Sequence, residues 1–245
     1  MGIKNFIGTS GYYYEHWKGV FYPEGLASHE FLKYYLQFFD SLELNSTFYH
    51  IPKASTITKW QKDLPEGFAL SIKANRVMTH IKRLKNIGED LKKFMAITSP
   101  LKEKLGVILF QLPPSLKMDI ALLNEFALLL KGYDSKFSIE FRHSSWVTDE
   151  VYKILQENNI AFCISDGPGY PYAEILTADF AYIRLHGHEA LYSSSYSGSA
   201  LKGYAEKINK FNAVQVPCYV YFNNDFGGFA VQNALTLKKF LKNSR

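Results

Sequence analysis

Short segments in which polar and hydrophobic residues alternate recur along this chain, and most of them end in polar side chains. The clearest reads KFSIEFRHSSW, from Lys136 to Trp146. A period of two, which is typical of a β-strand, puts its apolar side chains on one face and its polar side chains on the other. The two faces are Phe137, Ile139 and Phe141 against Ser138, Glu140 and Arg142.

Eight segments are predicted to be strands, and segments with helical spacing of apolar residues separate most of them. The strands are Phe6–Ser10, Leu42–Asn45, Phe68–Lys73, Gly106–Gln111, the segment from Lys136, Ala161–Asp166, Phe180–His186 and Cys218–Asn223. The helices are His29–Phe39, Ala54–Asp63, one within Asn86–Lys104 that is broken at Ser99-Pro100, Asp119–Leu130, Thr148–Glu157 with Thr148 as N-cap, Leu201–Phe211 and Val231–Leu241. Proline and glycine in GPGYPYAEILTAD predict that the sixth helix is short or missing.

Strands that alternate with helices pair in parallel through right-handed crossovers. A doubly wound sheet is covered on both faces, and its strands are almost wholly apolar. The strands of this chain have a polar face, which a closed barrel can direct toward its axis. We therefore predict an α/β protein with a (β/α)8 TIM barrel as one domain over residues 1–245; an incomplete barrel is the alternative.

Length and composition agree with one large core. The chain has 245 residues, of which 47% are hydrophobic. It has no run of 18 apolar residues, and its first residues lack the pattern of a signal peptide. Cys163 and Cys218 lie in apolar runs without a CxxC partner. These features predict a cytoplasmic protein with reduced thiols and no membrane partner.

Charge and aromatic content bear on possible ligands. The formal net charge of +5 is spread along the chain, and the one short basic cluster is Lys82, Arg83 and Lys85. A nucleic-acid partner is possible on this charge but weakly supported, and a solvated surface explains it equally. Aromatic residues make up 16% of the chain, and many lie in loops after strands. Those loops predict an aromatic rim of Tyr12, Trp17, Phe48, Tyr49, Trp146, Tyr192, Tyr196 and Phe226.

Five separate blocks resemble the YecE-like family, the domain of unknown function 72. They are Glu43–Tyr49 (ELNSTFY), Gln111–Pro114 (QLPP), Glu140–Trp146 (EFRHSSW), Arg184–Gly187 (RLHG) and Phe222–Asp225 (FNND). They occur in order over essentially the whole chain. The resemblance implies a TIM barrel and supplies no reaction. Family members tend to carry a tryptophan in the helix after the Ser/Tyr loop, where this chain has Tyr204 or a neighbour.

The catalytic candidates are Glu43, Glu140 and His186, because barrel enzymes build their active sites from the C-terminal ends of strands. Two carboxyl groups in unequal environments can divide the roles of acid and base. We expect Glu140 to stay ionised beside Arg142 and Glu43 to be the more easily protonated. A structural ion pair explains Glu140 and Arg142 equally well, and a lone histidine is more often structural.

The other strand ends predict a binding site for an anionic or sugar-like ligand. Arg142 and Arg184 are suited to an anion, although Lys73 can instead pair with a glutamate. The loop Asn223–Gly228 resembles a barrel phosphate site before a helix, but a tight turn explains its glycines equally. The predicted substrate-binding residues are Asn45, Tyr49, Lys73, Gln111, Arg142, Trp146, Asp166, Arg184, Asn223, Asn224, Gly227 and Gly228.

The sequence favours an enzyme, a hydrolase or isomerase acting on an anionic, phosphorylated or sugar-like substrate. No dinucleotide fingerprint and no ligand-spaced histidines occur, so we expect neither a cofactor nor a metal. Two alternatives stay open. One is a metal-assisted hydrolase of phosphoesters or nucleic acid, and the other is a non-catalytic binding or scaffold barrel with fixed ion pairs. The sequence does not indicate an oligomeric state.

Overall fold

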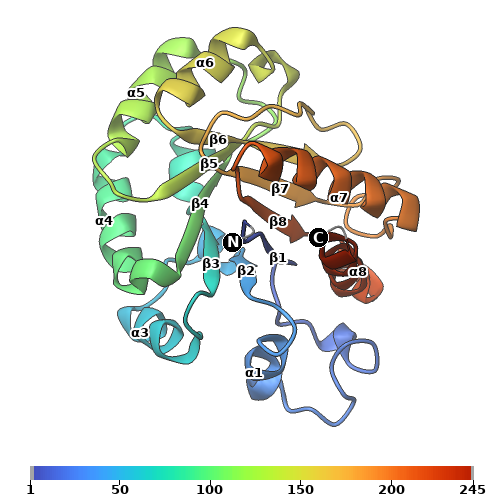
Figure 1. The fold of residues 1–245 in the computed structure, drawn as a ribbon. Helices are drawn as coiled ribbons and strands as arrows, with labels where there is room; N and C mark the ends of the chain where they lie inside the picture. Colours follow the sequence, from blue (N-terminus) through green and yellow to red (C-terminus); the bar gives the residue numbers. More distant parts are fainter. Residues whose placement is uncertain (1–2, 244–245) are drawn as a thin grey trace. The chain divides into compact units, whose positions relative to one another are not determined.

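A computed structural model describes residues 3–243, and eight parallel strands run through it in the order β1-β8-β7-β6-β5-β4-β3-β2 (Figure 1). The strands are β1 (Phe6–Thr9), β2 (Ser41–Leu44), β3 (Ala69–Lys73), β4 (Leu105–Gln111), β5 (Lys136–Glu140), β6 (Ile160–Asp166), β7 (Ala181–Leu185) and β8 (Cys218–Phe222). Each overlaps a predicted strand. The fifth ends at Glu140, because Ser144–Trp146 forms a 3-10 turn.

The first and last strands of this order meet. Ser10, directly after β1, forms a parallel bridge with Glu43 of β2, and the Gly11 N–H donates to the Glu43 carbonyl at 2.8 Å. Gly8 allows this approach, because a Cβ at that position would collide with the Ser41 carbonyl. Eight parallel strands with this closure form a (β/α)8 barrel, as the sequence predicts.

Contacts within the chain group it into two compact units. Unit 1 contains residues 3–43, 165–169 and 180–243, and unit 2 contains residues 44–164 and 170–179. The expectation that the chain acts as one domain stays a prediction.

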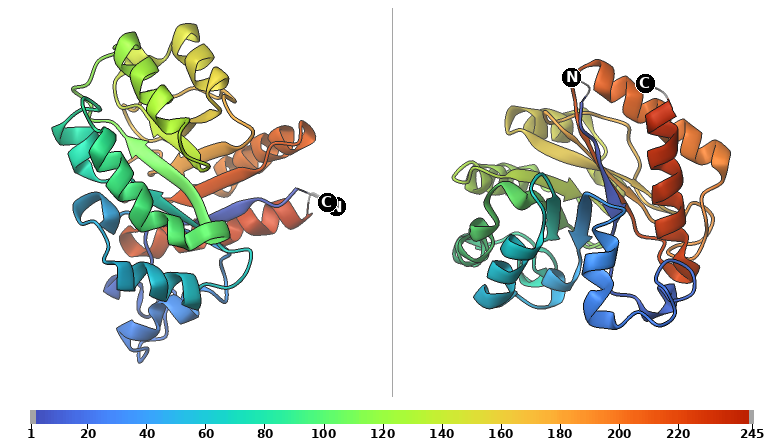
Figure 2. Two further views of the ribbon diagram at one scale, coloured as in Figure 1. Left: turned by 90° about the vertical axis from the view of Figure 1, so that its left-hand side faces the viewer. Right: turned by 60° about the horizontal axis from the view of Figure 1, so that its bottom comes forward.

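The helices of unit 1 are α1 (Phe31–Tyr35), α7 (Gly198–Ala213) and α8 (Phe229–Asn243). Helices α7 and α8 pack against each other, and α8 also contacts β1 and β8 (Figure 2). The predicted helix His29–Phe39 is too long, since a 3-10 turn, Ser28–Glu30, precedes the five-residue α1. Aromatic packing holds this short helix: the ring of Phe31 stacks on Tyr22 at 4.0 Å.

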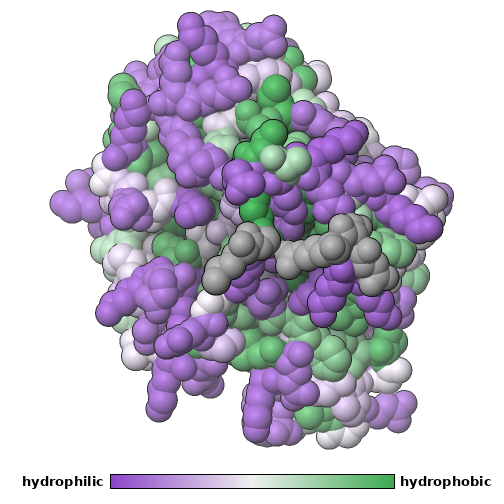
Figure 3. All heavy atoms as spheres, in the orientation of Figure 1, coloured by the Kyte–Doolittle hydropathy of each residue, from purple (hydrophilic) through white to green (hydrophobic). Residues whose placement is uncertain are grey.

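The helices of unit 2 are α2 (Ser46–Tyr49), α3 (Ala54–Asp63), α4 (Gly88–Thr98), α5 (Ile120–Leu130) and α6 (Asp149–Glu157). The break predicted near Ser99-Pro100 is confirmed, because α4 ends at Thr98 and Ser99–Lys104 is 3-10. Thr148 is the predicted N-cap of α6, and its hydroxyl accepts from the Val151 N–H at 3.4 Å. Hydrophilic side chains gather over α6 in Figure 3.

The sequence also predicts that the helix after the sixth strand is short or missing, and this is confirmed. Residues 167–180, between β6 and β7, contain no helix. Among residues 3–243, no helix has both the length and the apolar character needed to cross a membrane.

Candidate functional site

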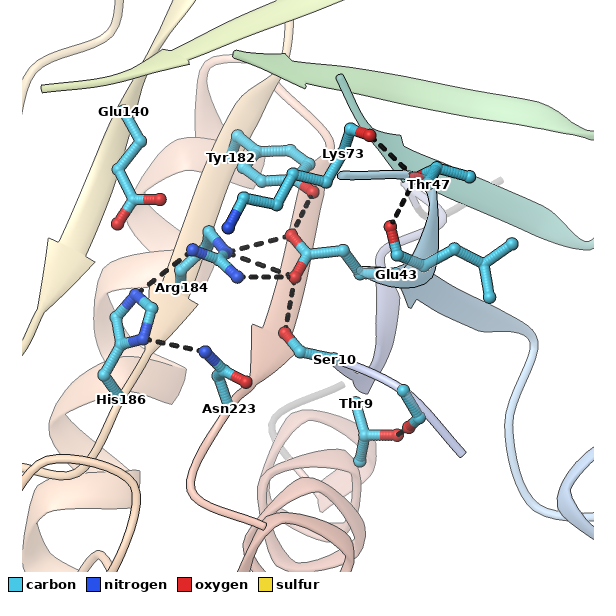
Figure 4. A network of polar contacts seen from close by, with 12 residues as sticks. Thr9, Ser10, Glu43, Thr47, Lys73, Glu140, Tyr182, Arg184, His186 and Asn223 are labelled. Carbon is cyan, nitrogen blue, oxygen red and sulfur yellow. Dashed lines mark hydrogen bonds and ion pairs between the residues drawn. The ribbon is translucent and has the colours of Figure 1, made fainter. Parts of the chain in front are cut away.

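Glu43 is the centre of a buried polar network in unit 1 (Figure 4). Its Oε1 accepts from Ser10 Oγ at 2.5 Å and from Arg184 Nη2 at 2.7 Å. Its Oε2 accepts from the Tyr182 hydroxyl at 2.6 Å and from Arg184 Nε at 2.9 Å. The glutamate is 0% exposed and the arginine 1%. The carboxylate therefore has a bidentate guanidinium and two hydroxyl donors.

This environment corrects one expectation from the sequence. Burial raises the pKa of Glu43, but the Arg184 charge and the hydrogen bonds from Arg184, Ser10 and Tyr182 outweigh it and hold the pKa below its ordinary value. The expectation that Glu43 protonates easily is therefore wrong, since its carboxylate is held ionised. It was made from the neighbours of Glu43 in sequence, whereas its partners come from β7 and from the end of β1.

The alternation predicted for β7 is confirmed in this network. Tyr182 and Arg184 both reach Glu43, and Arg184 Nη1 lies 3.4 Å from His186 Nε2. His186 Nδ1 lies 3.0 Å from the amide of Asn223, directly after β8. Because a guanidinium can only donate, Nε2 of His186 is its acceptor. Unit 1 therefore brings four of the predicted site residues together: Glu43, Arg184, His186 and Asn223.

Asp166, at the end of β6, makes contacts of its own. Its Oδ2 accepts from the Tyr204 hydroxyl at 2.7 Å, and its Oδ1 lies 3.3 Å from His188 Nδ1. Tyr204, one of the residues that can stand at the family's tryptophan position, thus has a defined partner.

The loop after β8, Asn223–Gly228, forms a tight turn. The sequence left open whether its glycines serve such a turn or a phosphate site. Gly227 and Gly228 have φ of 65° and 75°, and the Gly228 N–H donates to the Asp225 carbonyl. A Cβ on Gly228 would collide with Val20. The amide of Asn224 is also engaged, because it donates to the carbonyl of Ser194 and to Asn233 Oδ1. An anion-binding role for this loop stays a prediction, and the turn accounts for both glycines without one.

Glu140 and Arg142 form a buried ion pair in unit 2. Arg142 Nη2 lies 2.6 Å from Glu140 Oε1, and the two side chains are 7% and 0% exposed. The guanidinium also stacks on the ring of Tyr170, with Cζ 3.6 Å from the ring centroid. The two predicted catalytic carboxylates thus belong to different units, and each has an arginine of its own.

A cluster of positive charge surrounds His80 in unit 2, and the sequence interpretation missed it. Burial lowers the pKa of His80, and the charges of Lys73, Arg76 and Arg142 lower it further, to about 4. Lys73, the last residue of β3, places its ammonium 4.2 Å from the centroid of Phe48, whose ring meets His80 edge-on. We call these four basic residues, Lys73, Arg76, His80 and Arg142, the cationic cluster.

The backbone beside this cluster is unusual. Val77–Ile81 forms a π-helix, a rare element that is frequent at functional sites. Arg83, Leu84 and Asn86 follow with positive φ of 52°, 67° and 54°. Non-glycine residues in this conformation are uncommon, and strain of this kind gathers at functional segments.

The other predicted binding residues of unit 2 divide into exposed and buried. Tyr49 is 62% exposed, and Gln111 lies beside Glu140 in the register of β4 and β5. Asn45 Oδ1 is a buried acceptor for which the described chain offers no donor. Trp146 is 0% exposed, and its indole N–H donates to the Leu116 carbonyl. Trp146 is therefore a core residue, which corrects its placement in the binding site.

The predicted aromatic rim divides in the same way. Trp17 and Tyr196 are buried, like Trp146, and Phe48 is 9% exposed. Tyr192 and Phe226 of unit 1 are 42% and 67% exposed. An aromatic residue in a loop can pack inward or outward, and the sequence does not distinguish the two.

Neither unit displays an evident metal centre. Within residues 3–243, no three histidine, cysteine, aspartate or glutamate side chains are grouped so that they could hold a metal ion. The expectations that the protein needs no metal and no cofactor stay predictions.

Eight parallel strands with polar clusters at their C-terminal ends define a TIM-barrel protein. The chain belongs to the family described as "Protein of unknown function DUF72", whose model matches residues 6–245. It is 27% identical to the UPF0759 protein YunF of Bacillus subtilis, over 90% of this chain and 89% of that protein. It is 26% identical to the UPF0759 protein YecE of Escherichia coli K12, over 46% of this chain and 41% of that protein.

Solved structures of the family have the same fold. A DUF72 family protein of Thermotoga maritima MSB8 superposes with a TM-score of 0.86 at 36% identity, over 97% of this chain and 98% of that one. Another, from Enterococcus faecalis V583, has a TM-score of 0.84 at 22% identity over 98% and 96%. The resemblance that the sequence blocks indicate is therefore confirmed.

Proposed function

We propose that this protein is an enzyme, a hydrolase or isomerase, that binds a small phosphorylated or otherwise anionic sugar-like substrate at the cationic cluster. The observation that carries the proposal is the grouping of Lys73, Arg76 and Arg142 around the imidazole of His80, where Lys73 and Arg142 are each held against an aromatic ring. Burial lowers the pKa of His80 most, and the three cations lower it further, so the site is one where an anion is stabilised.

The cations are placed for recognition. Arg142 lies flat on Tyr170, and Lys73 lies over Phe48, so aromatic rings restrict both side chains. Arg76 is exposed and can reach a ligand from solvent. Glu140 pairs with Arg142 and fixes its orientation. Restricting donors before the ligand arrives lowers the entropy cost of binding.

His80 supplies the chemistry in this proposal. Its imidazole is neutral near pH 7 and can donate a hydrogen bond to a bound anion, and Thr79 Oγ1 lies 2.9 Å from its Nδ1. A bound anion raises the pKa of the imidazole from about 4, and proton transfer by His80 can then serve hydrolysis or isomerisation. The carboxylates of Glu43 and Glu140 are assigned positioning roles, because each pairs with an arginine.

The test is an NMR titration of the His80 ring protons with and without inorganic phosphate. A bound anion offsets the charges of Lys73, Arg76 and Arg142, so phosphate is expected to raise the pKa of His80 from about 4. Replacing Arg76→Gln removes one charged donor from an exposed position, and phosphate should then bind about tenfold more weakly. Lys92→Gln, an equal loss of charge at an exposed position of α4, is the matched control.

A scaffold barrel is the rival reading, and the saturated network around Glu43 supports it. That reading predicts that phosphate leaves the His80 titration unchanged. A phosphate effect that Arg76→Gln and Lys92→Gln weaken equally would assign the effect to net charge and reject the proposed site.

A further inference from the structure

We propose that unit 1 carries a binding surface for neutral saccharides, formed by His16, Tyr192, Asp225 and Phe226 and called here the saccharide surface. It goes beyond the proposed anion site, because it lies in the other unit and shares no residue with it. Three features of the surface support it: loops joined by hydrogen bonds, a strained tyrosine, and polar groups that can accept hydrogen bonds from a ligand.

Three loops at the C-terminal ends of β1, β7 and β8 are joined at this surface. The Asp225 carbonyl accepts from Trp17 Nε1 at 3.0 Å and lies 2.9 Å from His16 Nε2. The Phe226 N–H donates to the Tyr192 carbonyl at 3.2 Å. Phe226 therefore lies at the junction of the three loops with its side chain 67% exposed. The same hydrogen bond joins Phe226 to Tyr192, which is 42% exposed, so two exposed aromatic residues occur together at this junction.

Tyr192 is held in a conformation that tyrosine rarely adopts. Its φ is 64°, which brings its Cβ close to the backbone and strains a residue that carries a side chain. Its N–H donates to the His186 carbonyl at 2.6 Å, and its own carbonyl accepts from Phe226. Glycine or asparagine would fit this backbone with less strain. The ring, 42% exposed and edge-on to His186, is what the strained backbone presents to solvent.

The polar groups beside these rings match sugar hydroxyls. The Asp225 carbonyl can only accept, so Nε2 of His16 donates to it and Nδ1 is left as the acceptor on a half-exposed ring. The Asp225 carboxyl, 25% exposed, adds further acceptor oxygens. Aromatic faces cover the apolar C–H face of a sugar ring, while such groups bind its hydroxyls. The Asp225 carboxyl also disfavours an anionic saccharide by charge, so the ligand proposed is a neutral one.

The probes are glucose, N-acetylglucosamine, maltose and cellobiose, with binding followed by saturation-transfer NMR on the full chain. At least one of them is expected to bind the parent. Phe226→Ala should weaken that binding about fivefold, the worth of one aromatic contact. Tyr172→Ala is the control, because it removes an exposed aromatic ring from unit 2, and Tyr172 is 42% exposed, as Tyr192 is.

Tyr192→Asn separates a binding role from a structural one. Asparagine tolerates the positive φ, so the loop keeps its form and only the ring is lost. We expect weaker saccharide binding with an unchanged or higher thermal midpoint. The proposal is overturned if none of the four saccharides binds, or if Phe226→Ala and Tyr172→Ala behave alike. It is also overturned if Tyr192→Asn lowers the midpoint and leaves binding intact. Phosphate binding at His80 is measured separately, so either site can fail alone.

Discussion

Glu43 illustrates at the residue scale how completely a buried charge must be supplied with partners. An ionised carboxylate in a protein interior is costly unless donors replace the water it loses. Arg184 supplies two donors, and Ser10 and Tyr182 supply one each. The arrangement fixes the guanidinium of Arg184, which in turn reaches His186.

Removing the charge of Glu43 should therefore lower the free energy of unfolding substantially. Glu43→Gln leaves the buried guanidinium of Arg184 without its counter-ion, and we expect a loss of about 3–5 kcal/mol in the free energy of unfolding. Ser10→Ala removes a single hydroxyl donor from the same carboxylate and should cost only about 1 kcal/mol. Urea unfolding of the two variants measures both. Equal losses would mean that the ion pair adds nothing beyond an ordinary hydrogen bond.

The sequence predicts which of these residues lie on the same face of a strand, but it does not predict their hydrogen-bond and ion-pair partners. Alternation along β7 correctly places Tyr182, Arg184 and His186 on one side. The partner of Arg184 depends on where β2 lies in the sheet, and Glu43 is 141 residues away in sequence. The sequence did not indicate His80 as a site residue for a related reason. Its pKa results from cations on separate segments, so its neighbours in sequence do not reveal it.

At the scale of elements, strands and caps were predictable because their signals are local. The alternation of the strands and the side chain of Thr148 act over a few residues. The length of α1 was not predictable, because Ser28–Glu30 forms a 3-10 turn and the ring that stacks on Phe31, the first residue of α1, comes from the preceding loop. The π-helix and the positive-φ residues after β3 have no sequence pattern comparable to these.

The connection after α4 allows a test of backbone strain. Lys102 has φ 52° and ψ −128°, a region that glycine occupies far more readily than any other residue. Lys102→Gly should raise the free energy of unfolding by about 1 kcal/mol, because the relief of strain exceeds the added entropy of the unfolded chain. Lys92→Gly, at an exposed position within α4, should lower it by about 1 kcal/mol. Chemical denaturation measures the free energy of unfolding of both variants. A decrease for Lys102→Gly would show that the lysine is unstrained.

The pH dependence of stability belongs to the whole molecule, because it sums groups from both units. His80 has a depressed pKa, so its contribution is present above about 6.5 and is lost as the pH falls through about 4. Glu43 is also depressed, so its contribution is present above its unfolded value of 4.5 and is lost at lower pH. Asp225 acts in the opposite sense, since burial raises its pKa and its contribution is lost as the pH rises.

The free energy of unfolding should therefore fall as the pH is lowered. The contribution of His80 is lost first, and that of Glu43 is lost at lower pH. His80→Gln should remove about 1 kcal/mol of the loss between pH 7 and pH 4.5, a figure that allows for solvent screening of a half-exposed ring. Urea unfolding over a series of pH values measures this difference. Parallel curves for parent and variant would show that the imidazole ionises alike in the folded and unfolded chain.

The division of the chain into two units also orders events during synthesis. Every residue of unit 2 has been made once the ribosome passes position 179, whereas unit 1 needs residues from both ends of the chain. Strand β1 leaves the ribosome first, and its partner β8 is the last strand to follow. The backbone groups of β1 that bind β8 therefore stay unpaired throughout translation, and an unpaired strand edge is prone to wrong pairing. Until β8 has been made, β1 therefore has an unpaired edge that can pair with the wrong strand.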